Sequence, residues 1–270
     1  ASFGWIVSNE NFLKNSSWVD FLKVRASAGV AGATDSGATS VLADFSSNGR
    51  FLYKDYYTYS YIGSFYMGQN GGSWQNTLVP MFVSNENVVP ERSVKYNVGI
   101  DATLFKGLNL TVDAFLDKRS NILTLDNSKM GYYGKQYVFS SVGEMTNRGF
   151  EASAMYSGKS GDFSYRVNGM VSYAKNTIDY MAEVAPANDF SAQTGRPYGT
   201  YIGLVAERFY DVTDFDNAGN LKPGIPVPAF GSVQPGDVKY KDLDGNDVVD
   251  QNDVDQIGKS AYPEWYYSFG

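Results

Sequence analysis

The chain has 270 residues, with 22 Lys plus Arg against 29 Asp plus Glu and a formal net charge of −7. This acidic balance provides no basic field for a phosphate backbone, so we expect no nucleic acid among the partners. Cys and His are both absent. Their absence excludes Cys–His nucleophilic catalysis, histidine general-base chemistry, the usual zinc sites and disulfide bonds.

Aromatic residues make up 16% of the chain, with 21 Tyr and 17 Phe, and there are 28 Gly. Tyr and Phe favour pleated strands and Gly favours turns, so the composition predicts an all-β fold. No run of about 18 apolar residues predicts a transmembrane helix. The first ten residues, ASFGWIVSNE, do not predict a signal peptide. A barrel whose strands cross a membrane gives no such helical signal.

Apolar and polar residues alternate cleanly in four segments, which are residues 22–30, 94–104, 108–117 and 163–173. In the first of them, Leu22 and Val24 fall on one face, and Lys23 and Arg25 fall on the other. Such alternation is typical of strands of about ten residues with one apolar and one polar face.

The connections between these strands differ greatly in length. Residues 105–107 (FKG) and 157–162 (SGKSGD) form short turns. The other connections are long and rich in Gly, Asn, Ser, Asp and Tyr, and they cover residues 31–50, 60–93, 119–148, 175–200 and 211–262. Alternating strands fit either a soluble β-sandwich or an outer-membrane barrel. Short turns at one end and long loops at the other favour the barrel.

Four motifs occur in the order of a known family: VDFLKVRASAG (19–29), PERSVKYNVGIDATLFKGLNLTVDAFLDKRSNIL (90–123), GEMTNRGFEASAMY (143–156) and PGDVKYKDLDGNDVVDQNDVDQIG (235–258). Together they resemble the SusC/RagA family of TonB-dependent outer-membrane transporters. The resemblance covers nearly the whole chain and includes the Asn147–Glu151 stretch at the start of a barrel strand.

The resemblance implies an antiparallel transmembrane β-barrel of 22 strands with long extracellular loops. Residues 1–270 would be a single unit, the C-terminal part of that barrel, with the plug domain absent from this chain. The implied place is the outer membrane of a Gram-negative bacterium, in contact with its lipid. The implied function is import of a nutrient, an oligosaccharide or a peptide. The implied partners are a SusD-like surface lipoprotein and TonB, which acts through the plug and N-terminal region.

An alternative function belongs to a different class of protein. In that alternative the chain is a soluble or surface-attached β-sandwich that binds glycan and contains a calcium-stabilised loop. The two hypotheses differ in where the apolar faces of the strands point, which is to lipid in a barrel and to a core in a sandwich.

The segment DLDGNDVVDQND, residues 242–253, has nearly the ligand spacing of an EF-hand calcium loop. The predicted ligands occupy positions 1, 3, 5, 7, 9 and 12 of the loop, and they are Asp242, Asp244, Asn246, the carbonyl of Val248, Asp250 and Asp253. Two positions depart from the pattern, because Asp247 replaces the usual Gly and Asp253 replaces the usual Glu. We expect Ca²⁺ as a cofactor here; the alternative is a solvated acidic loop with Asx-turns.

Asp101 and Asp113 lie on neighbouring predicted strands and could form the carboxylate pair of a glycosidase. Charges that line a hydrated barrel need no catalytic role, and no other hydrolase feature accompanies the pair. We therefore expect no catalytic residue and no enzyme activity.

Flat aromatic side chains in the loops are candidates for stacking against sugar rings. The candidate substrate-binding residues are Trp74, Tyr132, Tyr133 and Trp265. The alternative is packing within the loops or contact with a partner, since aromatic residues also anchor interfaces.

Overall fold

The computed structural model describes residues 1–33, 56–68, 72–126, 128, 137–183 and 192–270. The chain forms two compact units, one of residues 1–184 with 264–270 and the other of residues 185–263. The sequence did not reveal this division, and the expected single unit over residues 1–270 stays a prediction. Among the described residues, no helix has the length and apolar character needed to cross a membrane.

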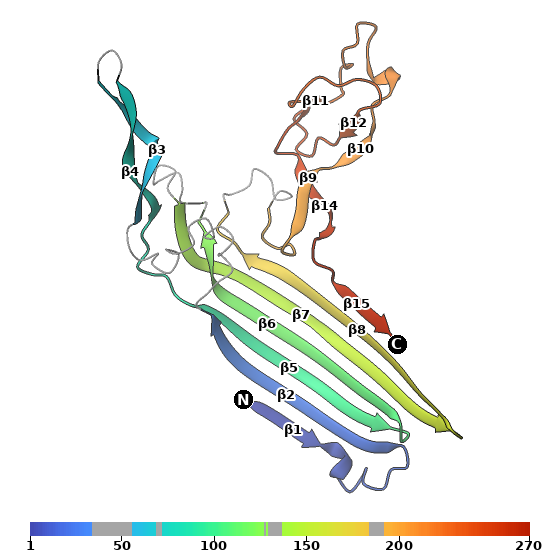
Figure 1. The fold of residues 1–270 in the computed structure, drawn as a ribbon. Coiled ribbons are helices and arrows are strands. Elements are labelled where there is room, and N and C mark those ends of the chain that lie inside the picture. Colours follow the sequence, from blue (N-terminus) through green and yellow to red (C-terminus); the bar gives the residue numbers. More distant parts are fainter. Residues whose placement is uncertain (34–55, 69–71, 127, 129–136, 184–191) are drawn as a thin grey trace. The chain divides into compact units, whose positions relative to one another are not determined.

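The first unit is built on one large antiparallel sheet (Figure 1). Its strands, in spatial order, are β1 (Ser2–Ile6), β2 (Val19–Ala33), β5 (Glu91–Leu104), β6 (Leu108–Leu125), β7 (Tyr137–Ser160), β8 (Phe163–Tyr180) and β15 (Trp265–Phe269). Each strand in the middle of the sheet is therefore paired on both sides, which satisfies its backbone hydrogen bonds without a second layer. A short 3₁₀ turn, η1 (Val7–Asn9), follows β1.

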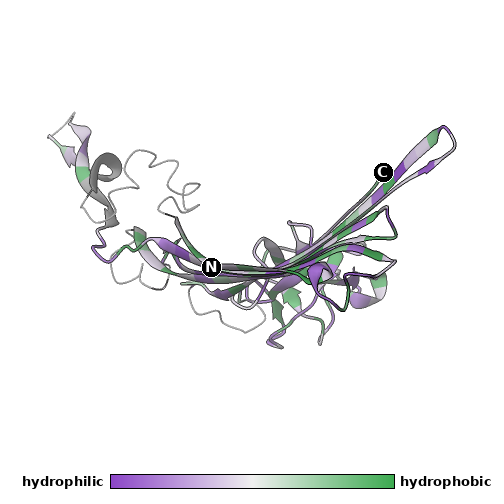
Figure 2. Ribbon diagram, turned by 90° about the horizontal axis from the view of Figure 1, so that it is seen from below, coloured by the Kyte–Doolittle hydropathy of each residue, from purple (hydrophilic) through white to green (hydrophobic). Residues whose placement is uncertain are grey.

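The register of the strands aligns side chains of one kind in rows across the sheet. One row is apolar and consists of Val24, Ile100, Val112, Ala152 and Val171. The next row is on the opposite face and consists of Arg25, Gly99, Asp113, Glu151 and Ser172. Because successive side chains of a strand point to opposite faces, the sheet has one apolar and one polar face. In Figure 2, hydrophilic and hydrophobic residues occur along the same strands.

The apolar face of the sheet is open to its surroundings. Ile100 and Val112 are each 45% exposed, and Val98 is 55% exposed. A β-sandwich would cover this face with a second sheet and bury these side chains. The β-sandwich alternative is therefore wrong for this fold, and the all-β prediction is confirmed.

The short turn predicted at residues 105–107 is confirmed. The one predicted at 157–162 is shorter than expected, because β7 extends to Ser160 and leaves only residues 161–162 before β8. Phe105 and Lys106 join β5 to β6 and have left-handed φ angles of 52° and 57°, which are uncommon for residues with a side chain. The Asp20 carboxylate of β2 accepts a hydrogen bond from the Lys106 N–H at 2.7 Å and so holds this turn. The β7–β8 turn has Gly161, with a φ of 61°, where that conformation costs least.

The strands are longer than the sequence predicted. β5 has 14 residues, β6 and β8 have 18 each, and β7 has 24, against about ten expected. They extend into segments that were predicted to be loops. The expected loop 60–93 also contains most of a hairpin, β3 (Tyr56–Met67) with β4 (Ser73–Val83). Pairing with a neighbour, rather than alternation within the segment, sets these strand lengths.

The second unit consists of short strand pairs around a small core. These are β9 (Thr200–Leu204) with β14 (Val254–Ser260), β10 (Ala206–Phe209) with β12 (Val238–Tyr240), and β11 (Val227–Pro228) with β13 (Val248–Val249). A 3₁₀ turn, η5 (Val212–Asp214), is capped by Asp211. The buried side chains of this unit include Tyr210, Phe215, Val249 and Asp253.

Candidate functional site

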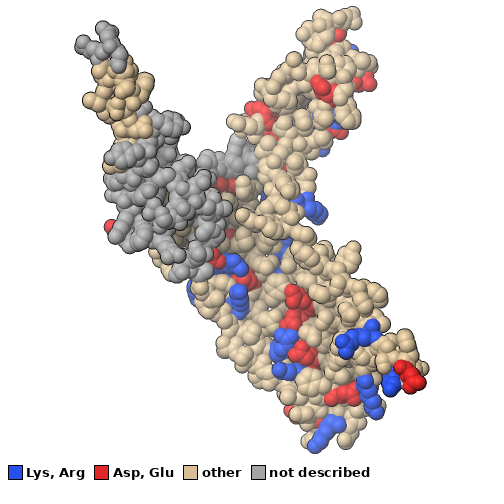
Figure 3. Space-filling view, viewed as in Figure 1, with Lys and Arg blue, Asp and Glu red and all other residues tan. Residues whose placement is uncertain are grey.

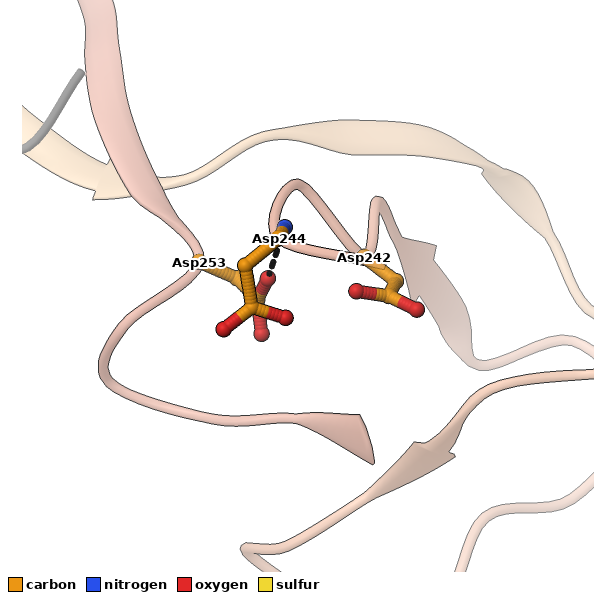
Figure 4. Close-up of side chains that lie close together, drawn as sticks. All are labelled: Asp242, Asp244 and Asp253. Atoms are coloured by element: carbon orange, nitrogen blue, oxygen red, sulfur yellow. Dashed lines mark hydrogen bonds between the residues drawn. The ribbon is translucent and has the colours of Figure 1, made fainter. Parts of the chain in front are cut away.

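The acidic loop 242–253 lies in the second unit between β12 and β14, with β13 inside it. Asp242, Asp244 and Asp253 each offer one carboxylate oxygen, and these three atoms lie within 4.8 Å of one another. Figure 4 shows the three carboxylates gathered on one side of the loop backbone. The structure thus brings together positions 1, 3 and 12 of the predicted calcium loop, and oxygens at such spacing are suited to a hard cation.

Asp253 closes the loop and has no exposed surface. One carboxylate oxygen accepts hydrogen bonds from the backbone N–H groups of Leu243 at 2.7 Å and Asp244 at 3.3 Å. The other accepts from the Asp250 N–H at 2.8 Å. These three backbone donors compensate for the loss of water around the buried side chain. Asp253 therefore ties the end of the loop to its beginning.

Asp242 organises the turn in the same manner. Its carboxylate accepts from the N–H groups of Gly245 at 2.7 Å and Asp247 at 2.8 Å. Asp247 has a φ of 64° and Gly245 a φ of 75°, so both adopt the left-handed conformation. Asp tolerates that conformation better than most residues. The absence of Gly at position 6 thus does not prevent the loop from turning.

The remaining predicted ligands have other hydrogen-bond partners. The Asn246 side-chain oxygen accepts from the Val248 N–H at 2.7 Å. The Asp250 carboxylate accepts from the Asn252 N–H at 2.7 Å and is not one of the three clustered carboxylates. These are Asx-turn contacts of the kind the alternative interpretation expects. Calcium binding and the ligand roles of these residues stay predictions.

The clustered negative charges affect the protonation of Asp244. Desolvation raises the pKa of the Asp244 carboxyl group, and the negative charges of Asp253 and Asp242 raise it further, while a hydrogen bond from the Asn246 backbone opposes them. A cation bound between these groups would reverse the repulsion, because an opposite charge favours the ionised form.

A second cluster of charges lies on the polar face of the large sheet. The Arg25 guanidinium donates to Asp101 at 3.0 Å and to Asp113 at 2.5 Å, so one cation joins β2, β5 and β6. Gly99 lies between Arg25 and Asp113 in the register. A Cβ atom on Gly99 would lie 2.5 Å from the Asp113 carboxylate and 2.8 Å from the Arg25 guanidinium carbon. The glycine therefore leaves the space that the ion pair occupies.

A related cluster surrounds Asp117 nearer the long connections. The buried Asp117 carboxylate accepts from the Ser93 hydroxyl at 2.6 Å and from Arg119 at 3.4 Å, and Lys95 lies 4.0 Å away. Arg119 also contacts Glu91 at 3.5 Å. Acidic and basic side chains lie next to one another over the large sheet (Figure 3). The polar face thus contains several ion pairs, and a polar surface of this kind suits the hydrated interior of a barrel.

The carboxylate pair considered for a glycosidase lies in the first of these clusters. Asp101 and Asp113 both pair with the Arg25 guanidinium. A glycosidase instead needs its two carboxyl groups to flank the bond that is cleaved. The geometry therefore supports an ion triplet and provides no observation in favour of catalysis.

Two of the four candidate aromatic residues are described. Trp74 lies in β4 of the hairpin, is 68% exposed and contacts Tyr66 edge to face at 5.8 Å. Trp265 lies in β15, with its ring 4.6 Å from Tyr173 and 5.9 Å from Phe150. The register places Trp265 in an apolar row, which favours packing over sugar contact. Tyr132 and Tyr133 lie outside the described residues.

The sequence did not predict a pocket of about 600 Å³ in the second unit. It is lined by Gly203, Leu204, Ala229, Phe230, Asp250, Gln251 and Val254. These residues come from three separate stretches of the chain, so no spacing in the sequence could have revealed them.

Comparison with known proteins places these features in one family. The family description "TonB dependent receptor-like, beta-barrel" matches residues 17–262. TonB-dependent receptor P3 of Formosa agariphila is 26% identical over 95% of this chain, and TonB-dependent receptor P26 of the same organism is 24% identical over 98%. The chain spans about a quarter of the length of these relatives, 24% and 25% respectively.

Solved structures show the same fold. The RagAB peptide importer in its "closed-closed" state matches 99% of this chain with a TM-score of 0.63 and 15% identity. The structure of the RagAB peptide transporter matches 99% with a TM-score of 0.65 and 16% identity, over 26% of that chain. The predicted resemblance to SusC/RagA transporters is confirmed, and the chain belongs to the TonB-dependent receptor-like β-barrel family.

Proposed function

We propose that this chain is the C-terminal barrel part of a transporter that imports an oligosaccharide or a peptide through the outer membrane of a Gram-negative bacterium. The observation that carries the proposal is the division of the large sheet into an apolar face and a polar face that contains ion pairs. The first suits contact with lipid and the second suits a hydrated passage.

The lengths of the connections support an orientation in which one end of the sheet faces the outside of the cell. The turns at 105–107 and 161–162 join strands at one end of the sheet, and the connections after β2, β6 and β8 at the other end are much longer. In outer-membrane barrels the long loops are extracellular. The second unit belongs to the connection between β8 and β15. It is therefore proposed to lie on the extracellular side, where substrate is captured.

The proposed partners are those that the resemblance to the SusC/RagA family implies. A surface lipoprotein of the SusD type is proposed to close over the extracellular loops. TonB is proposed to supply energy through a plug and an N-terminal region that lie outside these residues. Ion pairs such as Arg25–Asp113 keep the passage wall polar without leaving a strong field of one sign.

The substrate class has two candidates. The similarity to an importer described as a peptide importer supports a peptide. The exposed Trp74 in the β3–β4 hairpin supports an oligosaccharide, because a flat aromatic face packs against a sugar ring. Both substrates suit a mechanism of capture and gated passage without covalent chemistry.

Deletion of the gene for the parent protein tests the proposal. We expect the deletion strain to lose growth on one substrate class, either oligosaccharides as sole carbon source or peptides as sole nitrogen source. Growth should return with a plasmid copy, and a labelled substrate should accumulate only in the complemented cells. Unchanged growth and uptake on both classes would contradict the proposal. Recovery of the parent protein from the membrane fraction only in detergent is the accompanying control.

A further inference from the structure

The apolar face of the large sheet carries a belt of basic side chains, formed by Arg92, Lys118, Arg148 and Lys175. The register places Arg148 on the apolar face, one row beyond Phe150 and Tyr173 and directly opposite Lys175. Lys118 follows in the next row, on the strand beside Arg148. Arg92 lies one row further and completes the belt on β5. Four cations therefore lie on this face, next to the apolar rows that contain Phe150 and Tyr173.

Three cations on the polar face, Arg25, Lys95 and Arg119, each contact a carboxylate. Over the residues that the structure describes, no ion pair includes any of the four belt residues. On the face of the belt, the Asp179 carboxylate accepts a hydrogen bond at 2.5 Å from the hydroxyl of Thr146, which is the cross-strand partner of Lys118.

The closest pair in the belt has unfavourable geometry unless an anion lies beside it. Arg148 and Lys175 are direct cross-strand partners, so their Cβ atoms lie about 5 Å apart. Lys118 is diagonal to Arg148 at about 7–8 Å. Like charges opposite each other destabilise a sheet. The side chains of Lys118, Arg148 and Lys175 are long enough to converge on one phosphate group, which Arg and Lys bind strongly.

The distance of the belt from the short turns defines its depth in the proposed membrane. Lys118 is ten residues beyond Leu108, the first residue of β6 after the short turn. A tilted strand crosses the hydrocarbon core in about 9–11 residues. A barrel whose short turns lie at one membrane surface therefore places the belt at the opposite surface. That surface is on the side of the long connections, at the level of the lipid headgroups.

We propose that this belt binds the phosphate groups of anionic lipids in the outer leaflet, with the acyl chains against the apolar rows below. The proposal rests on the proposed membrane placement of the sheet. It gives the basic side chains a ligand of opposite charge at a depth where both acyl chains and phosphate groups are available. The binding would fix the depth and rotation of the barrel strands in the membrane.

The test uses the full-length parent protein in nanodiscs of equal phosphatidylglycerol and phosphatidylcholine, followed by native mass spectrometry of the retained lipids. The wild type should retain phosphatidylglycerol in preference by at least about fivefold. The variant K118Q/R148Q/K175Q should lose this preference. The control K23Q/R166Q/K159Q also removes one Arg and two Lys, but from the polar face, and should keep it.

Folding is checked by heat-modifiable migration in electrophoresis. Should the triple variant not fold, K175Q alone removes the like-charge pair and should lower the preference. Equal retention of the two lipids by the wild type would overturn the proposal, as would an unchanged preference in folded K118Q/R148Q/K175Q. Retention is measured without substrate, lipoprotein or TonB, so failure of the import proposal would leave this result unaffected.

Discussion

Arg25 of β2 reaches across the intervening strand β5 to donate a hydrogen bond to Asp113 of β6, with 2.5 Å between Nη2 and Oδ2. It can do so because the residue between them is Gly99, which has no side chain. The same guanidinium binds Asp101 of β5. One side chain therefore links three neighbouring strands on the polar face, and the glycine is as necessary to this contact as the two charges.

The first prediction concerns that glycine. In G99A the new Cβ would lie 2.5 Å from the Asp113 carboxylate and 2.8 Å from the Arg25 guanidinium, so the ion pair has to move. We expect the free energy of unfolding to fall by about 1–3 kcal/mol, as for other overpacked sites. Thermal unfolding of the parent protein in detergent measures this. The control G29A places a Cβ where nothing lies within 4 Å, and a similar loss there would contradict the explanation.

The second prediction concerns the acidic loop. Calorimetric titration of the parent protein with calcium should show binding, with D244N weakening it by at least about tenfold, since fewer ligand charges lower affinity. Asp244 is chosen because it is exposed, whereas Asp253 is buried and holds the loop together. D247N removes the same charge at a left-handed position that Asn also tolerates, so it should bind normally. No heat at millimolar calcium in the wild type would rule out the site.

Alternation in the sequence was sufficient to predict the two-faced strands and both short turns. Side chains alternate between faces with period two, so Leu22, Val24 and Arg25 could be assigned to faces without knowledge of the partners. The lengths of the strands could not be predicted in this way. β7 runs through the Gly- and Ser-containing stretch before Asn147 because β6 and β8 lie beside it and satisfy its backbone.

The candidate sites show the same limit. The spacing of Asp242, Asp244 and Asp253 predicted a shared location because all three belong to one short loop. The Arg25–Asp113 contact depends on three strands in register, and 88 positions separate its two residues. The face of Trp265 depends on its pairing with Tyr173. Chemistry that lies within one loop can be read from the sequence, whereas chemistry across strands requires the register.

The third prediction separates the two described aromatic candidates. W265A removes ring contacts with Tyr173 and Phe150, so we expect a loss of about 1–3 kcal/mol in stability and normal uptake by cells that retain the folded protein. W265F keeps an aromatic ring and should recover most of the loss. W74A should lower uptake of the imported substrate and leave thermal unfolding unchanged. The opposite pattern, with W265A impairing uptake in fully stable protein, would assign the substrate contact to Trp265.

The last prediction concerns pH and the second unit. The Arg208 guanidinium and the Asp211 N–H hold the pKa of Asp214 well below its usual range. A carboxyl group with a lowered pKa in the folded state adds stability above its ordinary pKa of about 3.9, and this contribution is lost as the pH falls further. We therefore expect D214N to reduce amide hydrogen-exchange protection around η5 at pH 7, and the difference from wild type to shrink below about pH 4. The control D162N removes a charge from the β7–β8 turn of the other unit and should leave hydrogen-exchange protection around η5 unchanged. A difference that persists undiminished in acid would show that Asp214 acts there through packing and not through its charge.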